Sequence, residues 1–551
     1  MRLALGALAL LLVALPASAP AQQPAATDAR AAAFARAETN GQKVEEVFRR
    51  TRRMMHAWLA YADERTLLLP DVLPGFLRGP RELHVYRPHN SGADNYPYLV
   101  ATAWFTDRPL YHGRLREMLR NEIRYTNAKA GVPANLNLET GALGPPSLFG
   151  AAEYAKDGLL AITELLGRTP WFHRMADMTA DLMQQAPVPS DFGPLPDAGA
   201  ELNGDVLQTL VRLASMTGEP RYLEWARRIG DAYVREVLPR NHGLPGYEWD
   251  FVKHEGPDRM RLRDHGNEIV VGLQLLHALE VERGGERASA WREPLARMLD
   301  RILQSANPDG LLYDDIRASD LQPRSQGLSD NWGYVYGAVY THYLVTGDER
   351  YREPVRRVLK SLPRYRGYDW ERGSHDGYAD AIESALYLVN REPVPEALDW
   401  IESETARLIA FQKDDGTIER WYGDGNWSRT LLLYAMMKTQ GTFLDGWQEG
   451  VALGAVRDGE RLLVSLKAPA GWSGRLRFDH ARHRRELNFA KNYVRLNEWP
   501  EWFTVDENAL YRLTAESGGV QVRLGSELKD GIAVGGSARF SVEALPRQAP
   551  R

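Results

Sequence analysis

Three carboxylates that could act together as acids and bases lie close together in the run SHDGYADAIE, which begins at Ser374. Asp376 and Asp380 are four residues apart and Glu383 follows three residues later, so all three can share one helix face. Crowded carboxylates raise one another's pKa, which suits a general acid. We therefore expect Asp376 and Asp380 to be catalytic. The alternative is a capping box, in which Asp380 and Glu383 bind helix N–H groups.

A second acidic group occurs in the run RDHGNE, which begins at Arg263. Asp264 could face Asp376 across a shared site, with His265 as the proton carrier. Arg263 and Asn267 would then bind the substrate. A lone histidine is more often structural, but this one is next to an acid at the expected start of a helix.

Aromatic and amide side chains accompany the acids at similar positions elsewhere. Pyranose rings stack on Trp and Tyr, while amides, acids and arginines bind hydroxyl and carboxylate groups. The runs DNWGY from Asp330 and WYGDGN from Trp421 therefore indicate sugar platforms, with aromatic packing between helix ends as the alternative. The expected substrate ligands are Asn203, Arg263, Asn267, Asp330, Trp332, Tyr334, His375, Tyr378, Trp421, Asp424, Asn426 and Arg429.

Three functions fit these residues. We favour a glycoside hydrolase acting on a glycan that contains uronic acid, because Arg263 and Arg429 could bind the sugar carboxylate and paired carboxylates could cleave the bond. A polysaccharide lyase is the alternative, in which a base removes the C5 proton and an acid protonates the leaving oxygen. Its candidate groups are Asn203 or Asn267 for the uronate, His265 or His375 as base, and Tyr334 or Tyr378 as acid. A glycan-binding protein without catalysis is the third possibility.

Composition excludes several other classes. The net charge is −5, from 68 basic and 73 acidic residues, whereas a nucleic-acid partner normally requires a basic excess. The absence of cysteine excludes thiolate metal sites and thiol nucleophiles. The sequence contains no GxSxG, GxxxxGK[ST] or HExxH motif. We expect no cofactor and no metal, and the partner to be an oligo- or polysaccharide.

The acidic and aromatic runs recur along the sequence, and each precedes an apolar stretch of helical length. Between these stretches lie turn signals such as TGEPRY, followed by amphipathic, arginine-rich stretches. Stretches such as VVGLQLLHALE are apolar on all sides and should be buried, whereas their partners are one-sided. Alternating buried and half-buried helices predict a closed (α/α) toroid of six or seven helical hairpins, with an open solenoid as the alternative. The key aspartates are Asp94, Asp157, Asp205, Asp264, Asp330, Asp376 and Asp424.

The chain divides into four expected parts. Residues 1–21 have the pattern of a secretion signal, which predicts a secreted or periplasmic protein that leaves the membrane after cleavage. Residues 22–42 are expected to be a flexible lead-in, and residues 43–445 the catalytic toroid. Short alternating runs such as RLLVSLKAP and ARFSVEAL predict a small antiparallel β-sandwich over 446–545. The fold class is thus mainly α with a C-terminal all-β module.

Over residues 45–545 the chain resembles the α/α-toroid carbohydrate-active enzymes: unsaturated glucuronyl hydrolases, related β-glucuronidases, and polysaccharide lyases that join a toroid to a β-sheet domain. The resemblance rests on the helix starts DHGNE, DNWGY, HDGYADAIE and GDGNW. It implies that aspartates at the mouths of the inner helices perform the acid/base chemistry, with Asp264 and Asp376 at the matching positions. The β module resembles that of the lyases more than the single-domain hydrolases.

Overall fold

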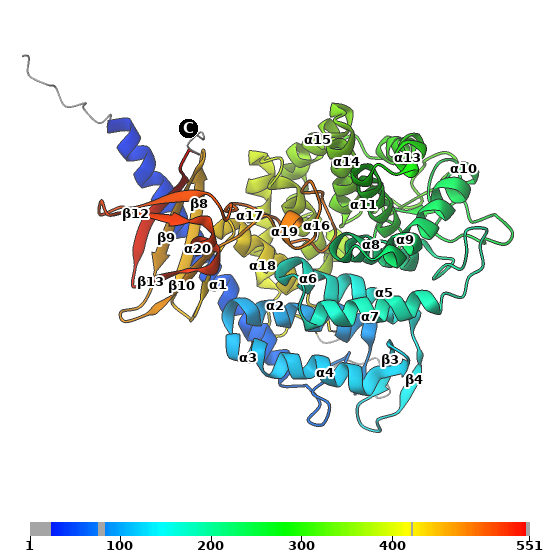
Figure 1. Ribbon diagram of the computed structural model, residues 1–551, viewed down its shortest axis with the longest axis horizontal. Coiled ribbons are helices and arrows are strands. Elements are labelled where there is room, and N and C mark those ends of the chain that lie inside the picture. Colours follow the sequence, from blue (N-terminus) through cyan, green and yellow to red (C-terminus); the bar gives the residue numbers. More distant parts are fainter. Residues whose placement is uncertain (1–23, 75–82, 420–422, 547–551) are drawn as a thin grey trace, which may run out of the picture.

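The computed structural model describes residues 24–74, 83–419 and 423–546, and consists of a large helical part and a smaller β part (Figure 1). None of the helices within these ranges is long and apolar enough to span a membrane. The expected signal at residues 1–21 lies outside the described residues.

Buried inner helices alternate along the chain with half-buried outer ones, as the hydrophobic pattern predicts. The inner helices are α2 (Tyr96–Thr106), the π-helical η2 (Tyr154–Leu159) continuing into α6 (Leu160–Leu166), α8 (Ala200–Thr217), α11 (Glu268–Arg283), α14 (Trp332–Thr346), α16 (His375–Val389) and α18 (Asn426–Thr439). The outer helices are α1 (Pro24–Leu59), α4 (Arg114–Thr126), α7 (Pro170–Gln184), α9 (Pro220–Ala232), α13 (Arg292–Gln304), α15 (Glu353–Ser361) and α17 (Pro395–Ala410).

The inner helices contact one another in chain order, and the last, α18, contacts both α1 and α2. The turns that end inner helices have the expected chemistry. Gly218 adopts a left-handed φ of 72° after α8 and its N–H bonds to the carbonyl of Ala214, while Pro220 begins α9. Gly347 ends α14 in the same way, with a φ of 73°. A left-handed residue is most readily glycine, so these positions fix where each inner helix stops.

Shorter elements connect these helices. The short helical segments are η1 (Pro88–Asn95), α3 (Arg108–His112), α5 (Leu148–Glu153), η3 (Tyr233–Val237), α10 (Leu238–Arg240), α12 (Glu286–Ala290), η4 (Glu349–Tyr351), η5 (Leu362–Tyr365) and η6 (Trp370–Gly373). The strands are β1 (Val85–Tyr86), β2 (Asn127–Lys129), β3 (Val132–Asn137), β4 (Leu143–Pro146), β5 (Met260–Arg261) and β6 (Asp315–Ile316).

The β part contains two antiparallel sheets. One has the strand order β12-β11-β14-β9-β8 and the other β13-β10-β7. The strands are β7 (Thr442–Asp445), β8 (Ala452–Asp458), β9 (Arg461–Lys467), β10 (Ser473–Phe478), β11 (Leu510–Ala515), β12 (Val520–Leu524), β13 (Ile532–Gly535) and β14 (Ala538–Ala544), with helix α20 (Gly525–Asp530) before β13. Strands β9 and β14 coincide with the runs RLLVSLKAP and ARFSVEAL, which predicted strands.

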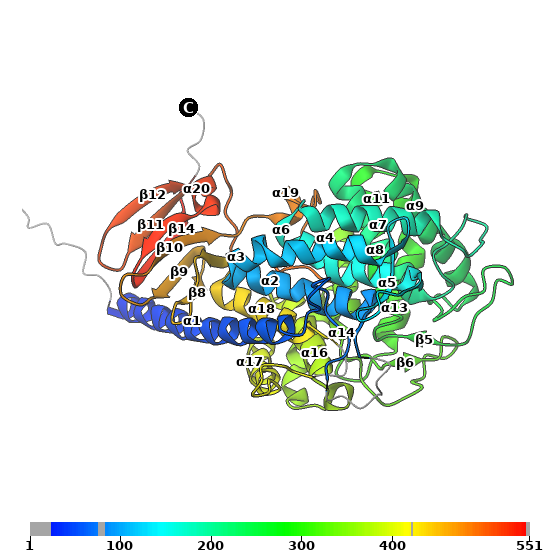
Figure 2. The same cartoon turned by 90° about the horizontal axis from the view of Figure 1, so that it is seen from below.

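Helix α1 corrects the expectation of a flexible lead-in over residues 22–42. The helix is continuous from Pro24 and runs along the β sheets before it reaches the helical part (Figure 2). Ala33 and Phe34 are buried against Leu463 of β9, and a Cβ added to Gly454 of β8 would clash with the backbone of α1. The apolar face of these early residues therefore packs on a sheet, which the sequence pattern alone did not reveal.

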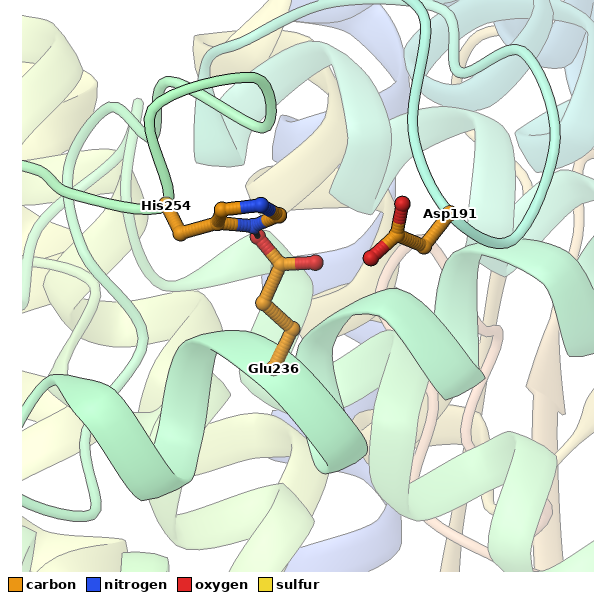
Figure 3. Close-up of side chains that lie close together, drawn as sticks. All are labelled: Asp191, Glu236 and His254. Atoms are coloured by element: carbon orange, nitrogen blue, oxygen red, sulfur yellow. Dashed lines mark hydrogen bonds and ion pairs between the residues drawn. The ribbon is translucent and has the colours of Figure 1, made fainter.

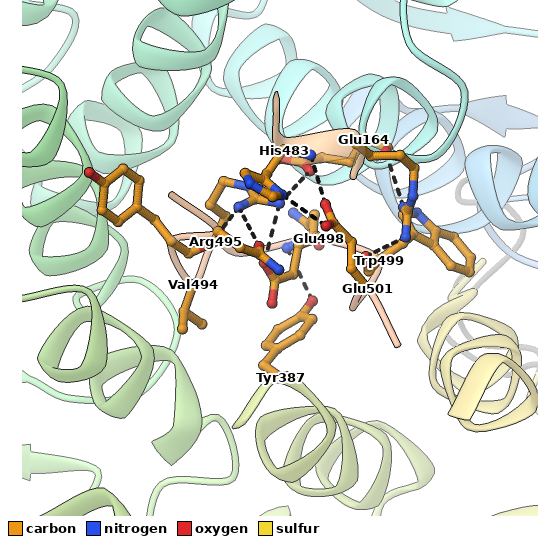
Figure 4. A network of polar contacts seen from close by, with 12 residues as sticks. Glu164, Tyr387, His483, Val494, Arg495, Glu498, Trp499 and Glu501 are labelled. Carbon is orange, nitrogen blue, oxygen red and sulfur yellow. Dashed lines mark hydrogen bonds and ion pairs between the residues drawn. The ribbon is translucent and has the colours of Figure 1, made fainter. Parts of the chain in front are cut away.

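The segment from Asp479 to Ala509 corrects the expectation that residues 446–545 form only a β-sandwich. It leaves the sheets after β10, forms helix α19 (Arg482–Arg485), and packs among the inner helices before β11 begins. Arg495 bonds to Glu164 of α6 at 3.0 Å (Figure 4). Arg212 of α8 donates to the carbonyl of Leu496 at 2.8 Å. This return segment joins inner helices that are far apart in sequence.

Candidate functional site

The N-terminal ends of the inner helices meet in one continuous network of polar side chains. Arg263, before α11, forms ion pairs with Asp330, before α14, and with Glu371, before α16. Asn426 of α18 donates to Asp376 of α16 at 2.7 Å. The four aspartates that the sequence placed at helix starts (Asp264, Asp330, Asp376 and Asp424) therefore belong to one site rather than to separate surfaces.

Helix α16 contributes the carboxylates at the middle of the network. It is capped by Ser374, whose Oγ accepts from the N–H of Gly377 at 2.9 Å, so Asp380 and Glu383 are not the capping box. Asp376 is half-buried and belongs to the first turn. Burial, together with the negative charges of Asp424 and Glu371, raises the pKa of Asp376 well above its usual value. A raised pKa makes this carboxyl group a better proton donor than an ordinary aspartate.

Asp380 lies one turn deeper and is bound to Arg429. The guanidinium of Arg429 donates to Asp380 at 2.8 Å and also pairs with the fully buried Glu383. The hydroxyl of Tyr334 donates to Glu383 at 2.9 Å. Burial and the charge of Asp376 raise the pKa of Asp380, while Arg429 opposes this shift. The arrangement holds Asp380 in a fixed position beneath Asp376.

Asp264 has the opposite electrostatic character. Its two oxygens accept from Arg263 at 2.7 Å and from His265 at 3.1 Å. Although burial would raise the pKa of Asp264, the hydrogen bond and charge of His265 and the charge of Arg263 hold it well below its usual range. The side chain remains 35% exposed. Asp264 is therefore an accessible carboxylate that stays ionised.

His265 does not have the properties of a proton carrier. Burial alone would lower its pKa, but hydrogen bonds to Asp264 and Glu201 raise the pKa to about 11. The backbone of His265 also adopts a left-handed conformation, with a φ of 71°. The two carboxylates favour the charged imidazolium, which argues against the expected role of His265 as a proton carrier.

Several expected substrate ligands instead form the layer beneath these acids. Asn267 is fully buried and donates to Asn331 at 2.9 Å. Asp330 is 2% exposed, and burial, with Arg263 opposing it, raises its pKa to about 8. His375 is buried between Asp424, at 2.9 Å, and Glu419. Their polar groups are therefore bonded to neighbouring protein groups.

Four further expectations are corrected or lie outside the described residues. Asn203 is fully buried and its amide bonds to the carbonyls of Asp197 and Gly199, so it fixes its own loop. Trp332 is fully buried, packed against Tyr336 of the same helix. Tyr378 is 6% exposed and packs on Phe411, which follows the outer helix α17. Each of these side chains is thus engaged by other protein groups. Trp421 lies outside the described residues.

The two arginines expected to bind a sugar carboxylate are also occupied. Arg263 pairs with three acids, Asp264, Asp330 and Glu371. Arg429 is 4% exposed and pairs with Asp380 and Glu383. A guanidinium that already neutralises several carboxylates has little remaining attraction for another one.

Two aspartates from the first inner helices complete the network, although we did not select them as site residues. Asp94, at the end of η1, is half-buried. Burial and the charges of Asp157, Asp424 and Asp376 raise its pKa well above the usual value. Asp157 of η2 pairs with Lys156 at 2.9 Å. Both aspartates belong to the recurring helix-start pattern, which was the signal that could have identified them.

Nothing in the sequence pattern marked Asn497 as a site residue. It belongs to the return segment and is 4% exposed, with a left-handed φ of 59°. Its amide nitrogen donates to Asp157 at 2.9 Å, and its amide oxygen accepts from Arg429 at 3.4 Å. Its backbone N–H bonds to the hydroxyl of Tyr387 at 3.1 Å. The C-terminal part of the chain thus contacts the floor of the site.

No protein-family model matches the sequence, and no curated protein matches it. The structure is similar to that of a sugar epimerase from a ruminal bacterium, with a TM-score of 0.40, 11% identity, and 58% of this chain and 86% of that chain covered. A family 76 glycoside hydrolase (mannosidase) from Bacteroides thetaiotaomicron matches with a TM-score of 0.40 and 13% identity. The match covers 71% of this chain and 97% of that chain. Cellobiose 2-epimerase from Spirochaeta thermophila matches with a TM-score of 0.41 and 14% identity, and the match covers 58% of this chain and 92% of that chain. All three of these structures are, by their descriptions, of enzymes that act on sugars.

Proposed function

We propose that this protein is a carbohydrate-active enzyme, and specifically a glycoside hydrolase. The observation that carries the proposal is a pair of carboxyl groups in one network whose pKa values shift in opposite directions. Burial and neighbouring charge raise the pKa of Asp376, whereas His265 and Arg263 overcome the effect of burial and lower that of Asp264. Glu371 links the two, because it pairs with Arg263 and its charge acts on Asp376. Hydrolysis needs one protonated and one ionised carboxyl group.

In the proposed reaction Asp376 gives its proton to the glycosidic oxygen, and the bond from that oxygen to the anomeric carbon breaks. The ionised Asp264 stabilises the developing positive charge and either attacks the anomeric carbon or activates water. Water supplies the hydroxyl group of one product and the proton that restores Asp376. Asn426 holds Asp376 in place at 2.7 Å, and Arg263 and His265 keep Asp264 ionised.

The lyase alternative has less support. It needs a neutral histidine or another base to remove the C5 proton, but hydrogen bonds to carboxylates raise the pKa of His265 to about 11 and also raise that of His375. Of the two tyrosines considered as the acid, Tyr378 packs on Phe411, and Tyr334 is 8% exposed and bound to Glu383. Neither group is placed to exchange a proton with a substrate.

The charges of the site favour an uncharged glycan. Carboxylates outnumber cations among the described side chains of the network, and Arg263 and Arg429 are both paired. An acidic sugar would approach a surface that already carries negative charge. Hydroxyl groups, by contrast, can donate to Asp264 and accept from the amide of Asn426.

A glycan containing uronic acid is the second candidate, and Arg261 favours it. This half-buried residue of β5 is close enough to Asp264 for its charge to lower the pKa of that carboxyl. Its Nε has no hydrogen-bond partner in the part of the chain that the structure describes. If the substrate is acidic, Arg261→Met should weaken its binding at least tenfold and leave neutral glycans unaffected.

A panel of neutral and acidic glycans, followed by mass analysis of the products, tests the proposal. Hydrolysis adds the mass of one water molecule per bond cleaved. Elimination adds none and gives an unsaturated product that absorbs ultraviolet light, which would establish the lyase alternative. Binding without release of reducing ends, with affinity retained in Asp376→Asn and Asp264→Asn, would establish a non-catalytic glycan-binding protein.

We also propose that the protein is exported to the periplasm or the medium. The support is the pattern of a charged start, an apolar run and small residues over 1–21. N-terminal sequencing of protein recovered from those compartments should begin after Ala21. Recovery of uncleaved protein from the cytoplasm alone would contradict export.

A further inference from the structure

A second cluster of ionisable side chains lies on the helical segment η3 and on the loops that precede α8 and α11. Asp191, Glu236 and His254 point their side chains toward one another (Figure 3). One possible ligand atom from each of the three lies within 4.8 Å of the other two. None of the three belongs to the network around Asp376.

The three residues come from separate segments that are held firmly together. Asp191 lies between α7 and α8, Glu236 on η3, and His254 in the loop that follows α10. The segment that holds His254 is hydrogen-bonded to the segment that holds Asp191. The backbone N–H of Trp249 donates to the carbonyl of Ala198 at 2.9 Å. The cluster therefore does not depend on one mobile loop.

The cluster holds two carboxylates and one histidine. The carboxylate of Glu236, whose side chain is 4% exposed, accepts from Trp249 Nε1 at 2.9 Å and contacts His254 Nδ1 at 3.0 Å. Asp191 has no hydrogen bond or ion pair within the described residues, although it faces that carboxylate (Figure 3). Two carboxylates this close repel each other, and one imidazolium can neutralise only one of them.

We propose that Asp191, Glu236 and His254 bind a divalent transition-metal ion of the zinc class. One imidazole and two carboxylates are ligands that zinc accepts, whereas calcium prefers a larger set of oxygens alone. A doubly charged ion balances both carboxylates, and its remaining positions would be filled by water. The ion joins the loop before α8 to the loop before α11. Helix α8 carries Glu201, and Asp264 lies in the second of these loops. Its role is to stabilise the fold.

Zinc titration of the full-length protein, stripped with a chelator, tests the site by calorimetry and by the melting temperature. We expect one zinc ion per chain and a higher melting temperature in its presence. Asp191→Asn removes an exposed ligand with little risk to folding and should weaken zinc binding at least tenfold, as should His254→Gln. His242→Gln is the matched control, because His242 is in the same loop region and also has a left-handed φ, of 56°.

Absence of stoichiometric binding to the wild-type protein would overturn the proposal, since the cluster would then be only an ion pair. Zinc binding that is equal in the wild type, Asp191→Asn and His254→Gln would also overturn it, because the ion would be bound elsewhere. The measurements do not depend on any catalytic activity.

Discussion

Asn497 donates a hydrogen bond to Asp157 across 340 residues of sequence, at 2.9 Å. The same amide accepts from Arg429, which in turn holds Asp380. A residue of the return segment therefore fixes two side chains of the helical network at once. Its own position is fixed by burial and by the bond from its N–H to Tyr387.

Replacing Asn497 should reduce catalysis more than binding. We expect Asn497→Ala to lower kcat by about tenfold, the range seen when groups that orient a functional side chain are removed, with a smaller change in KM. Asn488→Ala is the matched control, because Asn488 is in the same segment with a left-handed φ of 61° but bonds to Ser215. Equal loss of activity in both variants would indicate a general effect on folding.

The loss of kcat on replacing Asp376 should depend on the leaving group of the substrate, whereas the loss on replacing Asp264 should not. Asp376→Asn should lower kcat by about 10²- to 10⁴-fold on a natural glycan, because general acid catalysis is lost. On an aryl glycoside with a good leaving group the loss should be much smaller. Asp264→Asn should be impaired on both substrates. Steady-state kinetics on the two substrates measure these changes in kcat. Asp399→Asn is the control, because Asp399 is an exposed residue of α17. Full activity of Asp376→Asn on the glycan would refute its role.

The charged state of His265 should make stability depend on pH. Hydrogen bonds to Asp264 and Glu201 overcome the effect of burial and raise its pKa to about 11 from 6.5. Its stabilising contribution is therefore complete below pH 6.5 and is lost as the pH rises through about 11. The difference in free energy of unfolding between wild type and His265→Gln should shrink over this interval.

Urea unfolding at a series of pH values measures that difference. Because the His265 side chain is 41% exposed, added salt should reduce it. Glu201→Gln removes one of the two hydrogen-bond partners and should weaken the pH dependence. A difference that grows between pH 6.5 and 11 would contradict the assignment.

Breaking the buried ion pairs of the return segment should destabilise the fold. Arg495 is 1% exposed in its side chain and pairs with Glu164 and Glu498 (Figure 4). Arg495→Met leaves these acids partly uncompensated and should cost about 3–5 kcal/mol of unfolding free energy. Arg485→Met removes an exposed ion pair and should cost less than about 1 kcal/mol. Chemical denaturation compares the two, and equal losses would show that the return segment is not anchored through Arg495.

Much of the helical architecture could be predicted because its signals are local. The all-round apolar stretches identify the inner helices, and turn residues such as Gly218 and Gly347 fix their ends. The shared face of Asp376 and Asp380 follows from helical spacing alone. The strands β9 and β14 follow from alternation of side chains.

The remaining features depend on contacts that no local pattern encodes. Sequence pattern alone does not show which neighbour an aromatic ring on an inner helix will contact. Trp332 and Tyr378 were therefore expected to bind substrate, although both are buried. The pairing of Arg429 with Glu383 depends on the neighbouring helix. The packing of α1 on β8 and the position of Asn497 both depend on residues hundreds of positions away.

Helix α1 also has a consequence for how the polypeptide is produced. Arg30 lies near the beginning of the described chain and bonds to Ser541 of the last strand, 511 residues later. Glu38 likewise pairs with Arg539 of β14. A ribosome must therefore translate through β14 before Arg30 and Glu38 can reach these partners. Until then the buried face of α1 lacks its partner, and the nascent polypeptide would benefit from a chaperone that covers it.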